Sequence, residues 1–378
     1  MIDRNYKMVD LFAGCGGLSL GLEQAGFEPC FVNEIVEQFA NTYKQNHNLS
    51  DDHYFVGDIA VLNQNIDKYK KYLIDVTLVC GGPPCQGFSM ANRQRILDDP
   101  RNNLYKQYLI FLSNIRPQFF IMENVKGMMN KIDEIIQNFK EYLGNVYQYD
   151  YAILKAQDFG APQNRERFIM IGNRIGVNPK EIFEEIYKHK HYSFVLRDAL
   201  VGLPHLEARK EKGAKDVENE QSGFTIRDFQ YLKNDFYDFI NDGRKISKLY
   251  NHKNRYNNER DIEIYRRLPQ GANSLHESIA DIMPYKRRND IFKDKYFKLD
   301  ETQICKTITS HMKFDCNMYI HPWEARGLSP REAARIQTFP DDYVFTGAQN
   351  IWYAQIGNAV PVKLAKAIGD GIMKFIEK

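Results

Sequence analysis

The stretch Gly81-Gly82-Pro83-Pro84-Cys85-Gln86-Gly87-Phe88-Ser89 directly follows a mostly apolar run, Val76-Thr77-Leu78-Val79-Cys80. That run is short and unbroken, which predicts a buried β-strand. The two glycines and two prolines end the strand and predict a loop with Cys85 at its tip. In an open α/β sheet, ligands and chemistry lie beyond the carboxyl ends of the strands, so Cys85 is a candidate nucleophile. A cysteine taken alone is more often a small buried apolar residue, and the loop position makes the two interpretations about equal.

The composition is typical of an ordinary globular protein. The chain has 378 residues, of which 43% are hydrophobic and 26% charged, enough for two domains with a large core. No apolar run is long enough to cross a bilayer and the N-terminus lacks an apolar signal core, which predicts a cytoplasmic protein without membrane contact. The six cysteines form no C-x-x-C pair, so we expect no metal site and reduced thiols.

The basic residues are unevenly distributed. The segment from Arg244 to Lys298 holds 14 Lys and Arg against 7 Asp and Glu, whereas the formal net charge of the whole chain is only +2. The rest of the chain is therefore net acidic. One basic segment on an acidic body is typical of a surface that binds a polyanion. On charge alone, a solvated basic surface without a ligand is an equally good interpretation.

The N-terminal segment predicts a strand, a glycine turn and a helix. The strand is Tyr6–Phe12, and the turn is Ala13-Gly14-Cys15-Gly16-Gly17. A glycine turn lets a ligand approach the backbone closely. The third glycine of a dinucleotide-binding motif would fall on Ser19, so NAD is disfavoured. A plain tight turn between strand and helix remains the alternative.

Acidic residues follow three of the predicted strands. Glu34 comes after the strand 29–32, Asp58 after 53–56 and Glu123 after 118–122. A carboxylate at the end of a second strand commonly holds a ribose diol, and one after a third strand can accept a hydrogen bond from an exocyclic amine. Each acid alone is more often a turn or cap residue, but their repetition favours a ligand site.

The alternation of strands and helices predicts an α/β fold with a doubly wound, mostly parallel sheet. Two further strands, at 149–154 and 168–171, flank Gln163, Arg165 and Arg167, whose alternation directs the three side chains the same way. The polar stretch 92–103 is long enough for a mobile active-site loop. Ser329-Pro330-Arg331-Glu332 predicts a capping box that opens a helix, and an amphipathic helix ends the chain.

Together these stretches resemble the cytosine-C5 DNA methyltransferases of bacterial restriction-modification type, over nearly the whole chain. Six pieces carry the resemblance, in the order of the family: Asp10-Leu-Phe-Ala-Gly-Cys-Gly-Gly, Pro84-Cys-Gln, Glu123-Asn-Val, Gln163-x-Arg165-x-Arg167, Arg331-Glu-x-Ala-Arg-Ile-Gln337 and Gly357-Asn-Ala-Val-Pro. Each piece is moderately specific alone. Their order, with a variable basic segment between the fourth and fifth, makes the resemblance very specific.

The resemblance implies a Rossmann-like catalytic domain, residues 1–190 plus 328–378, that binds S-adenosylmethionine. A smaller, irregular DNA-recognition domain would span 191–327. The implied cofactor-binding residues are Phe12, Gly14, Gly16, Gly17, Glu34, Ile35, Asp58, Ile59, Pro83, Leu104, Asn358 and Ala359. Ile35 departs from members that carry an aromatic residue there, which predicts cofactor binding that is weaker but not abolished.

The resemblance also implies the chemistry. The Cys85 thiolate would add to carbon 6 of a cytosine flipped out of the duplex, which makes carbon 5 nucleophilic toward the methyl donor. Glu123 would stabilise the ring at nitrogen 3, and Arg165 is the candidate cation near the thiolate. The catalytic set is Cys85, Glu123, Gln163, Arg165 and Arg167, with no metal, and the base that removes the carbon 5 proton is not identified.

Double-stranded DNA is the expected partner. Candidate DNA-binding residues are Gln86, Ser89, Arg244, Lys245, Arg255, Arg287 and Arg288, although a solvated charge is an equally good interpretation of each basic one. We further expect a monomer, associated with the nucleoid and paired with a separate restriction endonuclease. The alternative is a tRNA cytosine-C5 methyltransferase on the same scaffold; the 161 residues between Arg167 and Ser329, where the next helix begins, favour DNA. A non-catalytic regulator is disfavoured by intact Cys85, Glu123 and Arg165.

Overall fold

The computed structural model of the chain describes residues 6–84, 104–192, 194–212, 217–230, 232–284 and 293–376. The chain forms two compact units. The first consists of Met1–Gly160, Glu166–Tyr192 and Val360–Lys378, and the second of Ala161–Arg165 and Ser193–Ala359. In the part that the structure describes, no helix is long and apolar enough to cross a membrane.

The first unit is built on a seven-stranded sheet with the order β3-β2-β1-β4-β5-β8-β6. The strands from β3 to β5 are parallel, while β8 runs antiparallel to both β5 and β6. This confirms the predicted doubly wound, mostly parallel sheet. The strands are β1 (Tyr6–Leu11), β2 (Phe27–Glu34), β3 (Tyr54–Val56), β4 (Leu78–Gly81), β5 (Phe119–Val125), β6 (Gln148–Lys155) and β8 (Glu166–Asn173).

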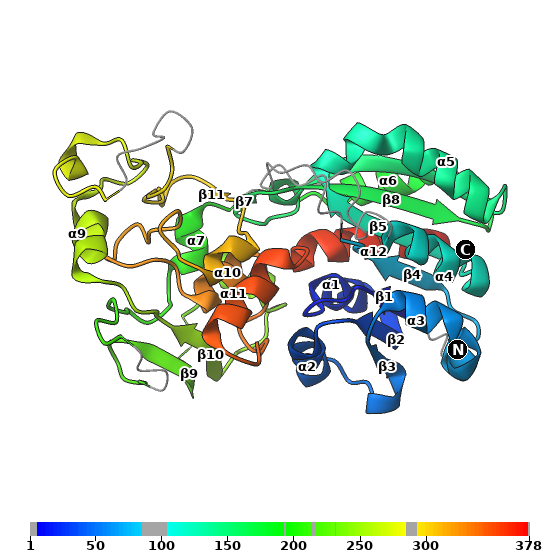
Figure 1. Cartoon of the computed structure of the whole chain (residues 1–378), viewed down its shortest axis with the longest axis horizontal. Helices are drawn as coiled ribbons and strands as arrows, with labels where there is room; N and C mark the ends of the chain where they lie inside the picture. The colour runs from blue at the N-terminus through cyan, green and yellow to red at the C-terminus, as the bar shows by residue number, and fades with distance from the viewer. Residues whose placement is uncertain are drawn as a thin grey trace. The chain divides into compact units, whose positions relative to one another are not determined.

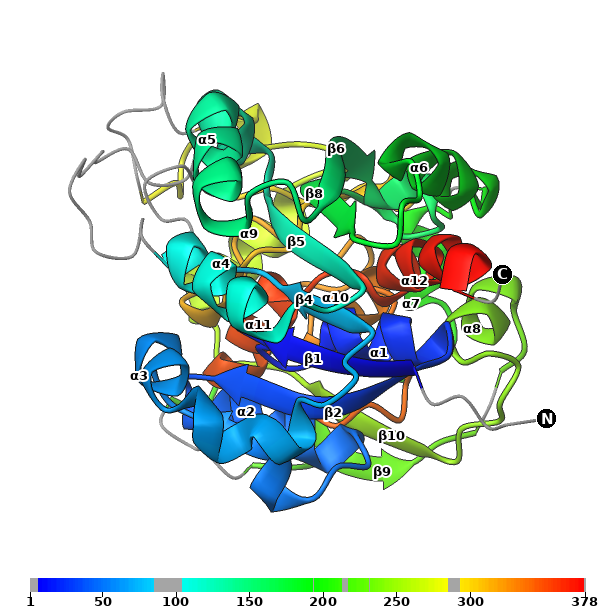
Figure 2. The same cartoon turned by 90° about the vertical axis from the view of Figure 1, so that its right-hand side faces the viewer.

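Helices cover both faces of this sheet (Figures 1 and 2). On one face α3, α4 and α5 pack against one another, and on the other α12 packs against α1 and α6. Helix α2 follows β2. The helices are α1 (Gly17–Gln24), α2 (Glu37–Asn46), α3 (Ile59–Gln64), α4 (Leu104–Ile115), α5 (Ile132–Leu143), α6 (Pro179–Lys188) and α12 (Val362–Ile376).

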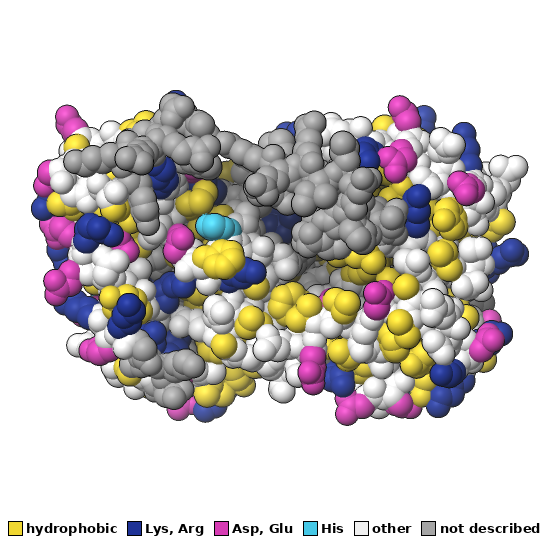
Figure 3. Space-filling view, in the orientation of Figure 1, with side chains coloured by type: hydrophobic (Ala, Val, Ile, Leu, Met, Phe, Trp, Pro, Cys, Tyr) yellow, Lys and Arg dark blue, Asp and Glu magenta, His cyan; other side chains and the backbone are white. Residues whose placement is uncertain are grey.

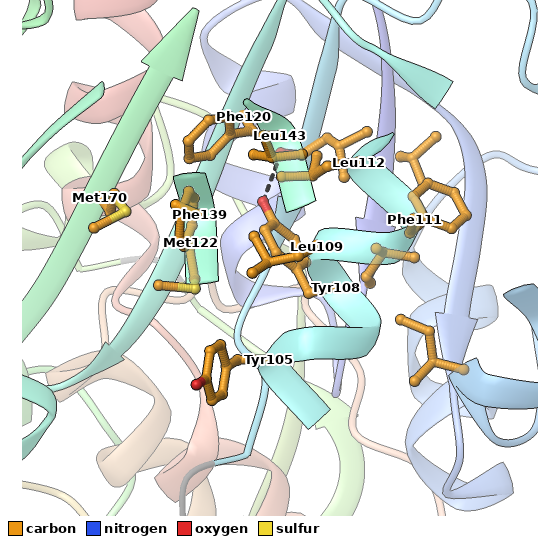
Figure 4. Close-up of a cluster of buried hydrophobic side chains, with 14 of the residues drawn as sticks. Tyr105, Tyr108, Leu109, Phe111, Leu112, Phe120, Met122, Phe139, Leu143 and Met170 are labelled. Atoms are coloured by element: carbon orange, nitrogen blue, oxygen red, sulfur yellow. Dashed lines mark hydrogen bonds between the residues drawn. The ribbon is translucent and has the colours of Figure 1, made fainter. Parts of the chain in front are cut away.

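The main core lies between the sheet and helices α3 to α5. Figure 4 shows α4 side chains such as Tyr108 and Leu109 lying against Phe120 and Met122 of β5 and Phe139 of α5. The Tyr108 hydroxyl donates to the Val79 carbonyl at 3.2 Å, so even its polar atom is satisfied inside the core. This packing fixes β4 and β5 side by side.

Glycine lets the C-terminal helix approach the first helix closely. A Cβ added at Gly21 of α1 would lie 2.3 Å from the Val362 carbonyl oxygen, and one at Gly369 of α12 would lie 2.6 Å from the Ala25 Cβ. No side chain larger than hydrogen fits at such separations. The end of the chain is therefore part of the first unit and supports the helix that follows the glycine turn.

The second unit holds short strands and helices joined by long irregular connections. Strands β9 and β10 form an antiparallel pair, and β7 pairs with β11 in parallel. The elements are β7 (Gln163–Asn164), α7 (Leu196–Leu200), β9 (Gly223–Asp228), α8 (Asp235–Ile240), β10 (Lys248–Lys253), α9 (Glu259–Arg267), β11 (Cys305–Lys306), α10 (Pro330–Ile336) and α11 (Gln349–Asn358).

The compact units depart from the predicted domain boundaries at residues 328–359, which we expected in the catalytic domain and which pack in the second unit. Buried arginines of α10 explain this placement. Arg331 Nε donates to the Tyr250 carbonyl at 2.7 Å, and Arg335 Nη1 donates to the Val201 carbonyl at 3.1 Å. The predicted capping box at Ser329 and Glu332 is confirmed.

Candidate active site

The glycine turn after β1 has the geometry of a ligand cradle. Gly14 and Gly16 take left-handed conformations with φ of 58° and 88°, and Phe12 does the same with φ of 58°. This conformation is strained for a phenylalanine, and such strain is typical of functional turns. A Cβ added at Gly14 would meet no heavy atom within 4 Å, so there is open space in front of the backbone. Gly17 is buried as the first residue of α1.

Glu34, at the end of β2, faces this turn. Its Oε2 accepts a hydrogen bond from Gly14 N at 2.8 Å, and its Oε1 accepts one from Val36 N at 2.8 Å. The side chain is buried, and burial raises the pKa of its carboxyl group. A carboxylate has about four lone-pair positions, so each oxygen keeps acceptor capacity for a ligand hydroxyl.

The other predicted cofactor residues of the first unit lie at neighbouring strand ends. Ile35 is 64% exposed, so its side chain is accessible to a ligand. Asp58 is exposed and caps α3 through a hydrogen bond from Ala60 N to its Oδ1. Ile59 and Pro83 are buried, and Leu104 packs against the core. A carboxylate, an apolar wall and bare backbone fit a nucleoside-containing cofactor.

A buried polar network lies beneath the turn. Ser19 donates to Asp10 Oδ2 at 2.6 Å, and Tyr43 donates to Ser19 Oγ at 2.8 Å. Asp10 is only 1% exposed, and burial raises the pKa of its carboxyl group to about 7. Below about pH 7 the neutral form of Asp10 therefore predominates in the folded protein.

We expect Asp10→Asn to become relatively more stable as the pH rises. The unfolded Asp10 carboxyl ionises near its ordinary pKa of 3.8, whereas the folded one ionises near 7. Wild-type stability therefore falls as the pH rises through this window and is lowest above it. Between pH 5 and pH 8 the unfolding free energy of the variant, relative to wild type, should increase by about 2 kcal/mol. Denaturant unfolding at pH 5 and pH 8 measures this difference in free energy. The control is Asp75→Asn, at an exposed position. The prediction is contradicted if the free-energy difference between Asp10→Asn and wild type is the same at both pH values.

At the ends of β4 and β5, the backbone that precedes Cys85 lies beside the Glu123 side chain. A Cβ added at Gly82 would lie 2.8 Å from Glu123 Oε2. Asn124 Nδ2 donates to the Pro83 carbonyl at 2.8 Å. The segment before Cys85 therefore lies against the Glu123 carboxylate, and a larger residue at position 82 would require that carboxylate to shift. Cys85 itself lies outside the described residues, as do Gln86, Ser89, Arg287, Arg288 and the predicted mobile loop.

Arg167 is the partner of Glu123. Arg167 Nε lies 2.7 Å from Glu123 Oε1, and both side chains are 12% exposed. Burial lowers the pKa of Arg167, and the Glu123 charge opposes that effect. The pair orients one carboxylate oxygen toward Arg167 and leaves the other beside Gly82.

Gln163 and Arg165 form hydrogen bonds near the C-terminus of α11. Arg165 is 1% exposed, and its guanidinium donates to the carbonyls of Ile308, at 2.6 Å, and Ala359, at 2.7 Å. Gln163 Nε2 donates to Gln337 Oε1 at 2.6 Å, and Gln337 in turn donates to the Ile356 carbonyl at 2.7 Å. These side chains satisfy the free carbonyls at the C-terminus of α11.

Asn358 and Ala359 lie at that helix end. Asn358 is exposed and Ala359 is half-buried. Arg165 and Gln163, which we expected beside Arg167 in the catalytic set, instead hold the backbone around Asn358. They belong to the second unit and Arg167 to the first.

The basic candidates in the second unit differ in their surroundings. Arg244 is paired with Asp342, and Lys245 is exposed. Arg255 donates from both terminal nitrogens to backbone carbonyls, those of Met312 and Phe314. The guanidinium of Arg255 therefore braces a turn.

The five described cysteines are buried thiols. Burial raises the pKa of Cys15, Cys30 and Cys305 to about 12 and also raises the pKa of Cys80 and Cys316. A thiol must ionise to act as a nucleophile, so these five are poor candidates. Among residues 6–84, 104–192 and the other described ranges, no cluster of three or more His, Cys, Asp or Glu could hold a metal ion.

Sequence reasoning missed three residues that shape this site. Gly82, Asn124 and Gln337 act through contacts with Glu123, Pro83 and the end of α11. Asn124 and Gln337 stand inside motifs that we had quoted, beside residues with assigned roles. Their positions next to a strand end or a helix end could have indicated a structural role in the site.

Comparison with known proteins identifies the family. Residues 6–374 match the family of C-5 cytosine-specific DNA methylases. The chain belongs to this family. It is therefore a DNA (cytosine-5-)-methyltransferase, as the motifs had predicted.

Curated relatives match the chain over almost its entire length. The type II methyltransferase M.DdeI of Desulfomicrobium norvegicum is 30% identical, covering 98% of this chain and 89% of the relative. M1.HphI of Haemophilus parahaemolyticus is 31% identical over 97% and 86% of the two chains. This methyltransferase thus shares both units with its relatives.

Solved structures agree on the fold. A putative DNA modification methyltransferase encoded within an Escherichia coli prophage has a TM-score of 0.77 at 27% identity, covering 99% of this chain and 100% of that one. The Schizosaccharomyces pombe Dnmt2 methyltransferase has a TM-score of 0.57 at 15% identity, over 99% and 100%. The second likeness shows the fold alone.

Proposed function

We propose that this methyltransferase uses S-adenosylmethionine to methylate carbon 5 of a flipped-out cytosine at a specific duplex DNA sequence, through a covalent bond between Cys85 and carbon 6. The observation that carries this proposal is the packing of Gly82 against Glu123, which places the chain entering Cys85 beside a carboxylate paired with Arg167. We further propose that it modifies DNA for a separate restriction endonuclease, which the type II methyltransferase names of its relatives support, and that it acts as a cytoplasmic, nucleoid-associated monomer.

The cofactor would be held by the cradle after β1. Glu34 accepts the ribose hydroxyls, Phe12 and Ile35 cover the adenine, and Asp58 accepts from its exocyclic amine. Gly14 and Gly16 let the methionine part approach the backbone, with Gly17, Ile59, Pro83 and Leu104 completing the pocket. When bound, S-adenosylmethionine supplies an electrophilic methyl group.

The residues of the chain prepare the cytosine. The Cys85 thiolate adds to carbon 6, which breaks the aromaticity of the ring and makes carbon 5 nucleophilic. Glu123 holds a proton at nitrogen 3 and so neutralises the charge that develops on the ring. Arg167 fixes the direction of the Glu123 carboxyl group. Loss of the carbon 5 proton then lets Cys85 leave, and the base for this step is unassigned.

The DNA-reading part of the proposal rests on the second unit. The basic segment lies in it, and Lys245 is exposed there. Lysine and arginine side chains on such a surface neutralise phosphates and release counterions. We therefore keep residues 191–327 as the proposed DNA-recognition region, with Arg244, Lys245, Arg287 and Arg288 as phosphate or guanine contacts.

Incubation with labelled S-adenosylmethionine and mixed-sequence duplex DNA tests this function. Sequencing that locates methylated bases should find 5-methylcytosine in one short motif. Label in tRNA instead of DNA would assign the protein to RNA, and label in neither would refute methyl transfer through Cys85.

We expect Glu34→Gln to weaken binding of the cofactor product, S-adenosylhomocysteine, about tenfold or more. The amide cannot accept from both Gly14 N and Val36 N, because its NH2 group would face a donor. Isothermal titration measures the Kd. The control is Glu37→Gln, an exposed carboxyl on the next helix, and a Glu34→Gln affinity within twofold of wild type would refute the assigned role.

A further inference from the structure

A short turn in the second unit exposes an aromatic ring. The turn is a 3-10 helix, η8 (Ser310–Lys313), followed by Phe314, whose side chain is 64% exposed. Met312 in the same turn is fully buried. The turn therefore buries one side chain and presents another to solvent. Single exposed apolar side chains are common on protein surfaces, so the groups beside Phe314 decide what this ring could contact.

The turn is held rigidly from behind. Arg255 Nη1 donates to the Met312 carbonyl and Nη2 to the Phe314 carbonyl, both at 2.8 Å. On the other side, a Cβ added at Gly357 of α11 would lie 2.2 Å from Ser310 N. A turn with a braced backbone loses little conformational freedom on binding, so more of its contact energy appears as affinity.

Cationic and aromatic groups meet at Phe314. The Lys313 ammonium lies 4.8 Å from the centre of the Phe314 ring, and the His311 ring lies 5.5 Å from it. The one acid of the turn, Asp315, lies 3.9 Å from His311 Nε2 and accepts a hydrogen bond from Asn317 N at 3.1 Å. On the face that Figure 3 presents, a histidine lies beside hydrophobic and basic side chains.

We propose that Phe314 is a base-contacting wedge, which packs against a base step of the bound duplex while Lys313 and His311 contact the flanking phosphates. This rests on the proposed function. Apolar wedges pack between base steps in proteins that distort DNA, and the face of an aromatic ring matches the face of a base. Lys313 beside the ring adds a positive charge that complements the phosphates of a duplex.

The test compares three variants of the full chain with S-adenosylhomocysteine bound, by fluorescence anisotropy on a duplex that the wild type methylates. Phe314→Ala should weaken DNA binding about tenfold, without changing the slope of log Kd against log salt concentration. Lys313→Ala should reduce that slope by about one. Tyr187→Ala is the matched control, because Lys190 lies 5.1 Å from the Tyr187 ring on α6 of the first unit.

The outcomes separate this inference from the proposed function. Weaker binding by Phe314→Ala, with Tyr187→Ala like wild type and an unchanged affinity for S-adenosylhomocysteine, supports the wedge. Phe314→Ala binding within twofold of wild type would overturn the wedge alone. If the wild type neither binds nor methylates duplex DNA, the proposed function and the wedge both fall.

Discussion

Cys85→Ser should lose methyl transfer by at least about a thousandfold while it still binds duplex DNA. A serine hydroxyl is far less acidic than a thiol, so almost none of it is ionised to attack carbon 6. The five described cysteines offer no substitute, because all are buried thiols. Transfer of labelled methyl groups measures turnover, and anisotropy on the same duplex measures binding.

A covalent-trapping experiment makes this prediction sharper. A duplex with 5-fluorocytosine at the target site has no carbon 5 proton to remove, so the covalent adduct should persist through denaturing electrophoresis. Wild type should give a shifted band and Cys85→Ser none. Cys30→Ala is the control and should keep both the band and turnover. Substantial turnover by Cys85→Ser would exclude the thiolate mechanism.

Glu332→Gln should lower the free energy of unfolding by about 3 kcal/mol. Arg326 is fully buried and donates to both Glu332 oxygens, at 2.7 and 2.6 Å. Burial alone would raise the pKa of Glu332. Arg326 and His321 lower it by more than that, so the pKa lies well below its usual range. Glutamine removes the negative charge and leaves the Arg326 guanidinium buried with Glu324 as its remaining counter-charge. Denaturant unfolding followed by tyrosine and tryptophan fluorescence measures the loss.

An exposed pair supplies the control. Glu263 on α9 pairs with Arg267 at 2.8 Å, four residues along an exposed helix surface. Glu263→Gln should change the unfolding free energy by less than about 0.5 kcal/mol, because water screens the pair. If the two variants lose similar stability, burial does not set the strength of the Arg326–Glu332 pair.

Several features of the first unit follow from local sequence. The strands at 76–80 and 118–122 were predicted as short apolar runs ended by glycine, proline or an acid, and the structure confirms β4 and β5 there. The capping box at Ser329 could also be predicted, because its hydrogen bonds join two residues only three positions apart. Interactions this local depend only on residue type and spacing.

The roles of the arginines could not be predicted in this way. Arg165 binds the carbonyl of Ala359, 194 residues further along, and Arg255 binds that of Phe314, 59 residues further along. From the sequence we predicted a catalytic role for Arg165 and a DNA-binding role for Arg255. The sequence does not show which backbone carbonyls the fold will place beside an arginine. The structure places both guanidinium groups on backbone turns.

The sequence by itself determined the family, the doubly wound sheet and the positions of the strand ends. These depend on hydrophobic period, on glycine and proline, and on the order of short motifs, all of which are local. Only the tertiary structure decided that α10 and α11 belong to the second unit, that Gly82 packs on Glu123 and that Phe314 is exposed. Such contacts join residues that are distant in the chain, and whether a polar group meets water or a partner depends on what the fold places beside it.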